Sequence, residues 1–340
     1  MDRVGRMVGN FNQLQAARRI TFRDGVSDGI RAIELRNRSG LYATCMEDQC
    51  LNLYDFSYRG INFSFQSKNG LVSNKFFNGG TSEFSYYWPA GMFYTCGLTN
   101  TGAAVLENGM YYAEHGRIGM MPAENVAVTH TDDAVVITGQ IADVMLCGHH
   151  LRLSRTITFP YVGKQIRIQD CVSNMEGIST ELMLLYHCNF GYPLLSPGAR
   201  IVMGKGILIN QIDGAPIPND FGSITEPRDD KCEEVYCNTP VPNTDGYAYA
   251  GVINEDLKLG GYVKFKTDTL PYMIYWKNMC AHDYCIGLEP SVSFSQGRKE
   301  ERENGTLPVL DPYETRVFEI SIGVLDGNGE IEEFEKLCKN

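Results

Sequence analysis

The sequence predicts an all-β fold, built as a large sandwich of antiparallel strands. Short runs in which apolar and polar residues alternate recur along the chain, and 35 glycines and 14 prolines separate them. Hardly any segment keeps a helical period over several turns. Alternation with a period of two residues directs one face of a strand to a core and the other face to water. These runs are therefore expected to pair in antiparallel sheets.

The alternation is clearest in two segments, LRLSRTITF at 151–159 and RVFEISIGV at 316–324. Shorter runs predict strands at 165–172, 201–208 and 262–266. Helical periodicity is confined to a short turn within 11–19 and to 331–339, where Ile331, Phe334 and Cys338 would line one face.

One region interrupts this pattern. Residues 213–245 are rich in Pro, Asp, Asn and Gly, and they are expected to form a long loop that acts as a lid or an oligomer contact. No repeat or linker stands out, so residues 1–340 are predicted to form a single domain.

The charge balance narrows the class of ligand. The net charge is −11, with 41 acidic against 30 basic residues and no basic stripe, which argues against nucleic acid and anionic membranes as partners. A small ligand that is neutral or weakly charged fits better. No apolar run is long enough to span a membrane and the N-terminus lacks a signal peptide, so a cytoplasmic protein is expected. The sequence leaves open whether the protein forms a homodimer.

The 11 cysteines are scattered through apolar segments, which is typical of reduced thiols packed in a core. Three pairs recur five residues apart, a spacing that places their side chains on opposite faces of a strand and does not suit a zinc site: Cys45/Cys50, Cys232/Cys237 and Cys280/Cys285. We therefore expect no metal and no cofactor.

Two histidines have informative surroundings. His115 lies in EHGRIG, where the glycines favour a sharp turn beside a ligand and Arg117 offers a planar set of donors. His187 ends the apolar run LMLLY, and Asn189 should point to the same face of that strand. The alternatives are a surface or capping role for His115 and a hydrogen-bonded core position for His187.

A carboxylate follows another buried run. Glu289 comes after Cys285-Ile286-Gly287-Leu288, and Lys277 follows an aromatic strand upstream. Desolvation would raise the pKa of Glu289 and make it a competent base near neutrality, whereas a structural ion pair with Lys277 or Arg117 is the alternative.

His187 and Glu289 together could move protons without a cofactor. The chain has no dinucleotide-binding glycine motif after a strand, no phosphate-binding loop, no HExxH and no GxSxG, so nucleotide, zinc-protease and hydrolase functions are not favoured. His149 and His150 are adjacent in a strand and must face opposite sides, so they cannot serve one site together.

EHGRIG, YHCNFGYPLL and GLEPS, in this order in an all-β chain, resemble motifs of the galactose mutarotase-like (aldose 1-epimerase-like) superfamily. The segments 31–65, 84–102 and 306–325 resemble its DUF4432 branch. The resemblance implies a supersandwich of antiparallel sheets with a sugar cleft, and interconversion of the anomers of a free sugar. It implies His187 as the general acid on the ring oxygen and Glu289 as the base on the anomeric hydroxyl.

The resemblance also implies sugar-binding residues. His115 and Arg117 would contact the ring oxygen and hydroxyls, and Asn189 would lie in the same pocket. Asp48 would accept from sugar hydroxyls, although Gln49 and Cys50 stand where the branch usually has Arg and Gly. Lys277 is the candidate replacement for that missing cation.

Trp88 and Tyr94 could stack on a sugar face or belong to the core. Two other functions remain open for the same residues. One is a sugar-binding or sensing protein without turnover, and the other is an isomerase or lyase that abstracts a carbon-bound proton.

Overall fold

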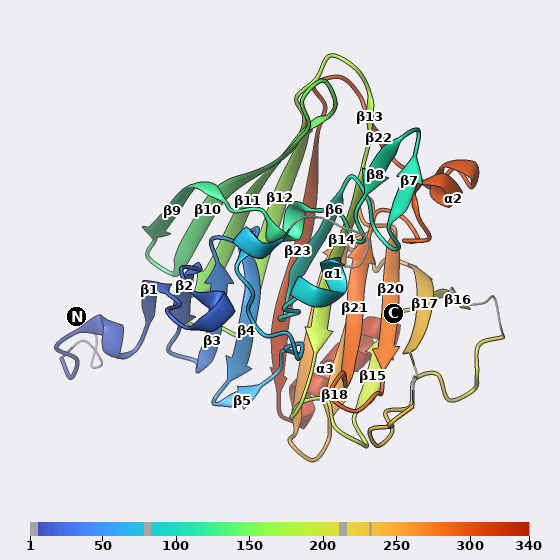
Figure 1. Cartoon of the computed structure of the whole chain (residues 1–340). Helices are drawn as coiled ribbons and strands as arrows, with labels where there is room; N and C mark the ends of the chain where they lie inside the picture. The colour runs from blue at the N-terminus through green and yellow to red at the C-terminus, as the bar shows by residue number, and fades with distance from the viewer. Residues whose placement is uncertain (1–5, 78–82, 211–215, 231–232, 340) are drawn as a thin grey trace.

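The computed structural model describes residues 6–77, 83–210, 216–230 and 233–339. Its strands form antiparallel sheets that lie against one another, as Figure 1 shows. The eight-stranded sheet contains, in spatial order, β15 (Arg200–Met203), β18 (Tyr247–Asn254), β19 (Leu259–Lys266), β23 (Thr315–Asp326), β12 (Gln165–Asn174), β11 (His150–Pro160), β10 (Ala134–Val144) and β9 (Glu124–His130).

Two further sheets complete the sandwich. The six-stranded sheet contains β16 (Gly206–Asn210), β17 (Glu233–Pro240), β20 (Tyr272–Asn278), β21 (Cys285–Ser291), β14 (Met183–Phe190) and β6 (Tyr94–Leu98). The five-stranded sheet runs in chain order through β1 (Ala16–Thr21), β2 (Arg31–Arg36), β3 (Leu41–Met46), β4 (Asn52–Tyr58) and β5 (Ile61–Asn62).

The remaining elements are short. Two strand pairs stand apart from the large sheets, β7 (Val105–Glu107) with β8 (Met110–Tyr112) and β13 (Thr180–Glu181) with β22 (Val309–Leu310). The α-helices are α1 (Glu83–Tyr87), α2 (Arg298–Glu303) and α3 (Asn328–Lys339), and the 3-10 turns are η1 (Phe11–Gln13), η2 (Gly25–Ser27), η3 (Asn74–Phe76) and η4 (Ile118–Met120). None of the helices in the described ranges is long and apolar enough to cross a membrane.

The all-β prediction is confirmed, and so are most of its elements. The alternating segments 151–159 and 316–324 lie within β11 and β23, with their apolar residues buried. The helix predicted at 331–339 is α3, and it buries the expected Ile331, Phe334 and Cys338. The helical turn expected within 11–19 is only η1, because the chain enters β1 at Ala16.

Two predicted segments differ from the structure. Residues 201–208 are two strands in different sheets, β15 and β16, because the chain leaves the eight-stranded sheet after Met203. The loop predicted at 213–245 contains β17, which pairs with β16 and β20. Residues 211–215 and 231–232 lie outside the described ranges. Burial of Tyr236 and Cys237 in β17 outweighs the loop-like composition around it.

One hydrophobic core is shared by the three large sheets. It contains Leu35 of β2, Ile157 of β11 and Leu184 of β14, among many other fully buried side chains. The ten described cysteines are free thiols, as expected, while Cys232 lies outside the described residues. The single-domain organisation stays a prediction of the sequence.

A charged network crosses this core. The guanidinium of Arg155, fully buried on β11, donates to both carboxylate oxygens of Asp170 at 2.8 and 2.6 Å. It also donates to the Cys50 carbonyl at 2.7 Å and the Thr95 hydroxyl at 2.9 Å. The Tyr186 hydroxyl donates to Asp170 at 2.7 Å. The network therefore ties β11 and β12 to the six-stranded sheet that carries His187.

Candidate active site

Strand pairing places His187 and Glu289 side by side. β14 and β21 are antiparallel neighbours, and their register pairs Leu185 with Ser291 and Cys188 with Leu288. This register puts His187 opposite Glu289, although 102 residues separate them in the chain. Two side chains at directly opposite positions of adjacent strands project from the same face of the sheet.

The apolar run that ends in His187 is buried on both faces of the sheet. Leu184, Tyr186 and Cys188 pack into the central core. Leu185 and His187 occupy the alternate positions of the strand, so their side chains project from the opposite face, where a second apolar cluster lies. A continuous apolar run is typical of a strand covered on both sides, so the histidine sits in an enclosed site rather than at a solvent-exposed strand end.

The pair is almost completely buried. His187 is 5% exposed and Glu289 2%, and His187 Nδ1 lies 3.2 Å from Glu289 Oε1. The contact does not have hydrogen-bond geometry, and these two atoms have no other hydrogen-bond partner in the described structure.

Burial moves the two pKa values in opposite directions. Desolvation, reinforced by His115, holds the pKa of His187 well below its ordinary value, while a hydrogen bond with Asn189 opposes this shift. Desolvation and then the charge of Glu233 raise the pKa of Glu289 well above its ordinary value. The pair can therefore hold one proton in two forms, a carboxylic acid beside a neutral imidazole or a carboxylate beside an imidazolium.

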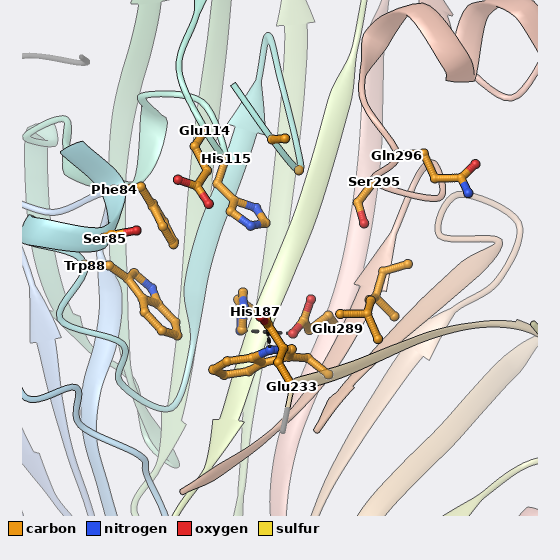
Figure 2. Close-up of a pocket in the computed structure, with 15 residues that line it drawn as sticks. Phe84, Ser85, Trp88, Glu114, His115, His187, Glu233, Glu289, Ser295 and Gln296 are labelled. Carbon is orange, nitrogen blue, oxygen red and sulfur yellow. Dashed lines mark hydrogen bonds and ion pairs between the residues drawn. The ribbon is translucent and has the colours of Figure 1, made fainter. Parts of the chain in front are cut away.

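A cavity of about 550 Å³ opens above this pair, as Figure 2 shows. Its volume suits a small organic ligand. The residues that line it come from the α1 region, the 102–115 segment, β14, β17, β20, β21 and the turn before α2: Phe84, Ser85, Trp88, Gly102, Ala103, Glu114, His115, His187, Glu233, Val235, Ile274, Trp276, Glu289, Ser295 and Gln296.

Aromatic rings form one wall of the cavity. Trp88 lies 4.9 Å from the His187 ring and stacks on Phe84 at 5.3 Å, centroid to centroid. Trp276 lies 5.4 Å from His187 and 5.8 Å from Trp88. Tyr94 packs behind this wall and does not line the cavity. Flat apolar faces beside a polar pair suit the C–H face of a sugar ring.

His115 completes the histidine side of the cavity. It adopts a left-handed conformation with φ of 52°, and its backbone N–H donates to the Gly102 carbonyl at 3.0 Å. The centroid of its ring lies 6.0 Å from that of His187. Gly116 follows with φ of 72°, and a side chain there would collide with the Gly97 carbonyl. The turn therefore fixes the His115 ring over the cavity.

The partly buried His115 imidazole should make the fold sensitive to acid. Desolvation lowers the pKa of His115 from 6.5 to about 4, so the unfolded chain binds a proton that the folded chain does not as pH falls through this window. The unfolding free energy should therefore fall from pH 6.5 to 4, by at most ~3 kcal/mol from this residue. His187 contributes with the same sign.

Urea unfolding between pH 7 and 4 measures this effect. The loss of stability with acid should be smaller in His115→Gln than in wild type, and His282→Gln, which does not line the cavity, serves as the matched control. The same pH dependence in wild type and His115→Gln would contradict the expectation.

Gly287 makes room for the carboxylate. It lies on the same face of β21 as Glu289, and a Cβ at Gly287 would stand 2.1 Å from Glu289 Oε1 and 3.2 Å from the Trp276 Cβ. The Glu289 side chain therefore folds back over Gly287, where the Cβ of any other residue would collide with it.

Gly287→Ala should displace the Glu289 carboxylate with little effect on stability, since the colliding atom is the end of a flexible side chain. We expect the activity of the site to fall by about tenfold or more, because a misplacement of 1 Å at a catalytic group can cost ~10²-fold. Gly329→Ala on α3, where a Cβ meets nothing within 4 Å, is the matched control. Full activity in Gly287→Ala would show that this placement is unimportant.

Two predicted sugar contacts lie outside the cavity. Arg117 is exposed and does not line it, because the turn at His115 and Gly116 directs the two side chains apart. The Asp48 carboxylate accepts from the Arg31 backbone at 2.7 Å and from its guanidinium at 3.0 and 2.6 Å. The structure thus brings His115, but neither Arg117 nor Asp48, to His187 and Glu289.

Lys277 and Asn189 do not line the cavity. On β20, Ile274 and Trp276 face the cavity, so Lys277 points to the other face, where Nζ is 3.2 Å from Glu234 Oε1. Asn189 is buried, and its amide donates to the carbonyls of Gly91 at 2.9 Å and His187 at 3.1 Å. Asn189 is thus placed to position the strand around His187.

Sequence reasoning did not single out several of the lining residues, among them Glu114, Trp276 and Glu233. Trp276 precedes Lys277 on β20 with the opposite parity, so strand alternation was the available signal for Trp276. Glu114 lies in the turn at His115, where alternation gives no signal. Glu233 lies in the segment expected to be a loop. Its Oε1 accepts from Trp276 Nε1 at 2.7 Å, which is a tertiary contact with no local sequence signal.

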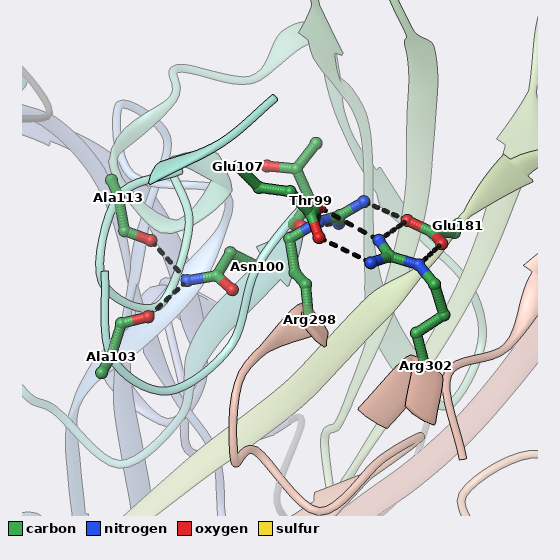
Figure 3. A network of polar contacts seen from close by, with 8 residues as sticks. All are labelled: Thr99, Asn100, Ala103, Glu107, Ala113, Glu181, Arg298 and Arg302. Atoms are coloured by element: carbon green, nitrogen blue, oxygen red, sulfur yellow. Dashed lines mark hydrogen bonds and ion pairs between the residues drawn. The ribbon is translucent and has the colours of Figure 1, made fainter. Parts of the chain in front are cut away.

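An ion-pair network, drawn in Figure 3, joins segments that flank the cavity. Arg302 on α2 pairs with Glu107 of β7 at 2.5 Å and with Glu181 of β13 at 2.6 Å. The buried Arg298 pairs with Glu181 and donates to the Thr99 carbonyl. The network therefore joins the segment before His115 to the helix that follows Ser295 and Gln296.

Among the described residues, no group of three or more His, Cys, Asp and Glu side chains is arranged to hold a metal ion. A family model described as "Domain of unknown function (DUF4432)" matches residues 27–324. The chain belongs to the DUF4432 family. No protein with a curated description matches this family member in sequence.

Solved structures show the fold of this DUF4432 chain. A Klebsiella pneumoniae protein, whose assignment as an aldose 1-epimerase is provisional, has 22% identity and a TM-score of 0.87, covering 96% of this chain and 89% of that one. A galactose mutarotase-like protein from Clostridium acetobutylicum has 13% identity and a TM-score of 0.66, covering 93% and 100%.

Galactose 1-epimerase from Lactobacillus acidophilus has 11% identity and a TM-score of 0.62, covering 92% of this chain and 100% of that one. At these identities the likeness shows the fold alone. The chain has the galactose mutarotase-like fold, as the sequence motifs predicted.

Proposed function

We propose that the chain is a cofactor-independent isomerase of the aldose 1-epimerase type, which interconverts the α and β anomers of a free sugar. The observation that carries the proposal is the buried contact of 3.2 Å between His187 Nδ1 and Glu289 Oε1 in a cavity walled by aromatic rings. Anomer exchange needs one acid and one base at a single carbon, and this pair supplies both.

In the proposed reaction, His187 as the imidazolium gives its proton to the ring oxygen while the Glu289 carboxylate takes the proton of the anomeric hydroxyl. The bond between the anomeric carbon and the ring oxygen breaks, and a carbonyl group forms. Rotation about the C1–C2 bond presents the other face of the carbonyl. Reclosure returns both protons with the roles of His187 and Glu289 exchanged.

The geometry and the pKa directions support this sequence. The ring oxygen and the anomeric oxygen are bonded to the same carbon, so an acid and a base that lie side by side can reach both. The pKa of His187 is lowered and that of Glu289 is raised, so the preference of the shared proton for the imidazole over the carboxyl, as it exists in water, is weakened or reversed. A pair that exchanges roles in each turnover needs both of its protonation forms to be accessible.

The surrounding residues would bind the sugar. Trp88 and Trp276 would pack on its apolar face, and His115, neutral near pH 7 because its pKa is about 4, would offer a donor or an acceptor to a hydroxyl. Asn189 would act as a positioning residue for His187.

Saturation-transfer proton NMR of anomer exchange in wild type, over a panel of free aldoses and ketoses, tests the proposal. Exchange faster than the uncatalysed rate for at least one sugar is the expected result. Sugar binding without exchange would favour a binding protein instead. Entry of solvent deuterium at a carbon-bound position would identify an isomerase or lyase that abstracts a carbon-bound proton.

A further inference from the structure

The charge of the cavity follows from its lining. The His187–Glu289 pair with one shared proton has no net charge in either of its two forms. His115 is neutral near pH 7, since burial lowers its pKa to about 4. The two remaining ionisable residues that line the cavity in the described part of the chain are Glu114 and Glu233, so the site has a net negative charge.

These two carboxylates differ in their contacts. Glu233 accepts from Trp276 Nε1 at 2.7 Å, which holds it at the aromatic wall. Glu114 lines the cavity, and no hydrogen bond or ion pair joins it to another described residue. Desolvation and then the charge of Glu233 raise the pKa values of both Glu114 and Glu289, so the three carboxyl groups interact within one cavity.

Other features of the cavity point to a ligand as the missing partner. His187 and Glu289 are more than nine-tenths buried and line the cavity, and neither His187 Nδ1 nor Glu289 Oε1 makes a hydrogen bond in the described structure. No lysine or arginine of the described residues lines the cavity. A phosphate or carboxylate group on a ligand would meet carboxylates without a compensating cation.

We propose that the cavity selects its sugar by charge, taking a neutral or ammonium-bearing sugar and rejecting one with a phosphate or carboxylate group, and that Glu114 and Glu233 are the residues that set this preference. The inference rests on the proposed function only for the identity of the ligand as a sugar. Like charges brought together in one site oppose binding, whereas an ammonium group gains from both the carboxylates and the aromatic faces.

A series of sugars that differ in charge at one carbon tests the preference. D-Galactose, 6-amino-6-deoxy-D-galactose and D-galactose 6-phosphate, with the matching three D-glucose compounds, provide neutral, cationic and anionic members. We expect kcat/KM for exchange of the 6-phosphates to be about 100-fold or more below that of the neutral sugars, and that of the amino sugars to be equal or higher.

The Glu114→Gln/Glu233→Gln variant separates charge from size, because it keeps the shape of both side chains. The ratio of kcat/KM for the 6-phosphate to that for the neutral sugar should rise about tenfold or more in this variant. Glu332→Gln/Glu333→Gln changes the net charge equally on the exposed face of α3 and should leave the ratio unchanged.

Saturation-transfer difference NMR on the same samples reports binding without turnover. If no sugar is exchanged, the proposed function fails, and the same order of binding among the three charges would still support the charge preference. Equal kcat/KM or equal binding across the series, or an unchanged ratio in the Glu114→Gln/Glu233→Gln variant, would overturn the charge preference and leave the proposed function standing.

Discussion

Replacing Glu289 by glutamine should lower the rate of anomer exchange by about 10²–10⁴-fold, the usual contribution of a general acid or base. Glutamine keeps the shape of the side chain over Gly287 but cannot take or give the proton that the carboxyl group exchanges with the anomeric oxygen. Because the carboxyl is 2% exposed, water has little access to replace it. Saturation-transfer NMR on the best sugar of the panel measures the loss.

The stability of this variant should not fall. The carboxyl has no hydrogen bond in the described structure and its pKa is raised by burial, so a neutral amide avoids a desolvation cost that the carboxylate bears. Glu332→Gln on the exposed face of α3 is the matched control for exchange and thermal unfolding. Exchange at the wild-type rate in a folded Glu289→Gln protein would refute the assigned role.

A double variant tests whether the two residues act as one unit. If His187 and Glu289 carry the same proton transfers, His187→Gln combined with Glu289→Gln should be little slower than the worse of the two single variants. Rate losses that multiply would indicate two independent contributions.

Arg155→Met should destabilise the fold by about 3–5 kcal/mol, the cost of leaving one charge of a buried pair without its partner. Arg155 and Asp170 are both fully buried, and the guanidinium also satisfies the Cys50 carbonyl and the Thr95 hydroxyl. Urea unfolding followed by circular dichroism measures the change in unfolding free energy.

The control lies on the same strand. Arg152→Met removes the same charge from the opposite, solvent-facing side of β11 and should change stability by no more than about 0.5 kcal/mol. Replacing Asp170 by leucine together with Arg155→Met should recover part of the loss, since no unpaired charge then remains. A stability loss in Arg155→Met no larger than in Arg152→Met would show that the network does not support the fold.

The class of fold could be predicted from the sequence. Alternation in 151–159 and 316–324 depends only on neighbouring residues, and burial of one face of a strand enforces it, so β11 and β23 could be predicted within a few residues. α3 was predictable for the same reason, because Ile331, Phe334 and Cys338 follow the helical period. β17 was missed, because the polar and proline-containing sequence around it hid a short strand whose pairing partners are distant in the chain.

For the site, the sequence by itself determined which residue types are available: a histidine within an apolar run, a carboxylate within another, and a glycine two residues before that carboxylate. Only the tertiary structure decided which of them meet. It brought His187 to Glu289 through the pairing of β14 with β21, and it added Glu233 and Trp276. It also placed Arg117, Asp48 and Lys277 elsewhere. The physical reason is that the local sequence determines which residues of a strand face the core, whereas the register and the partners of the strand depend on packing across the whole core.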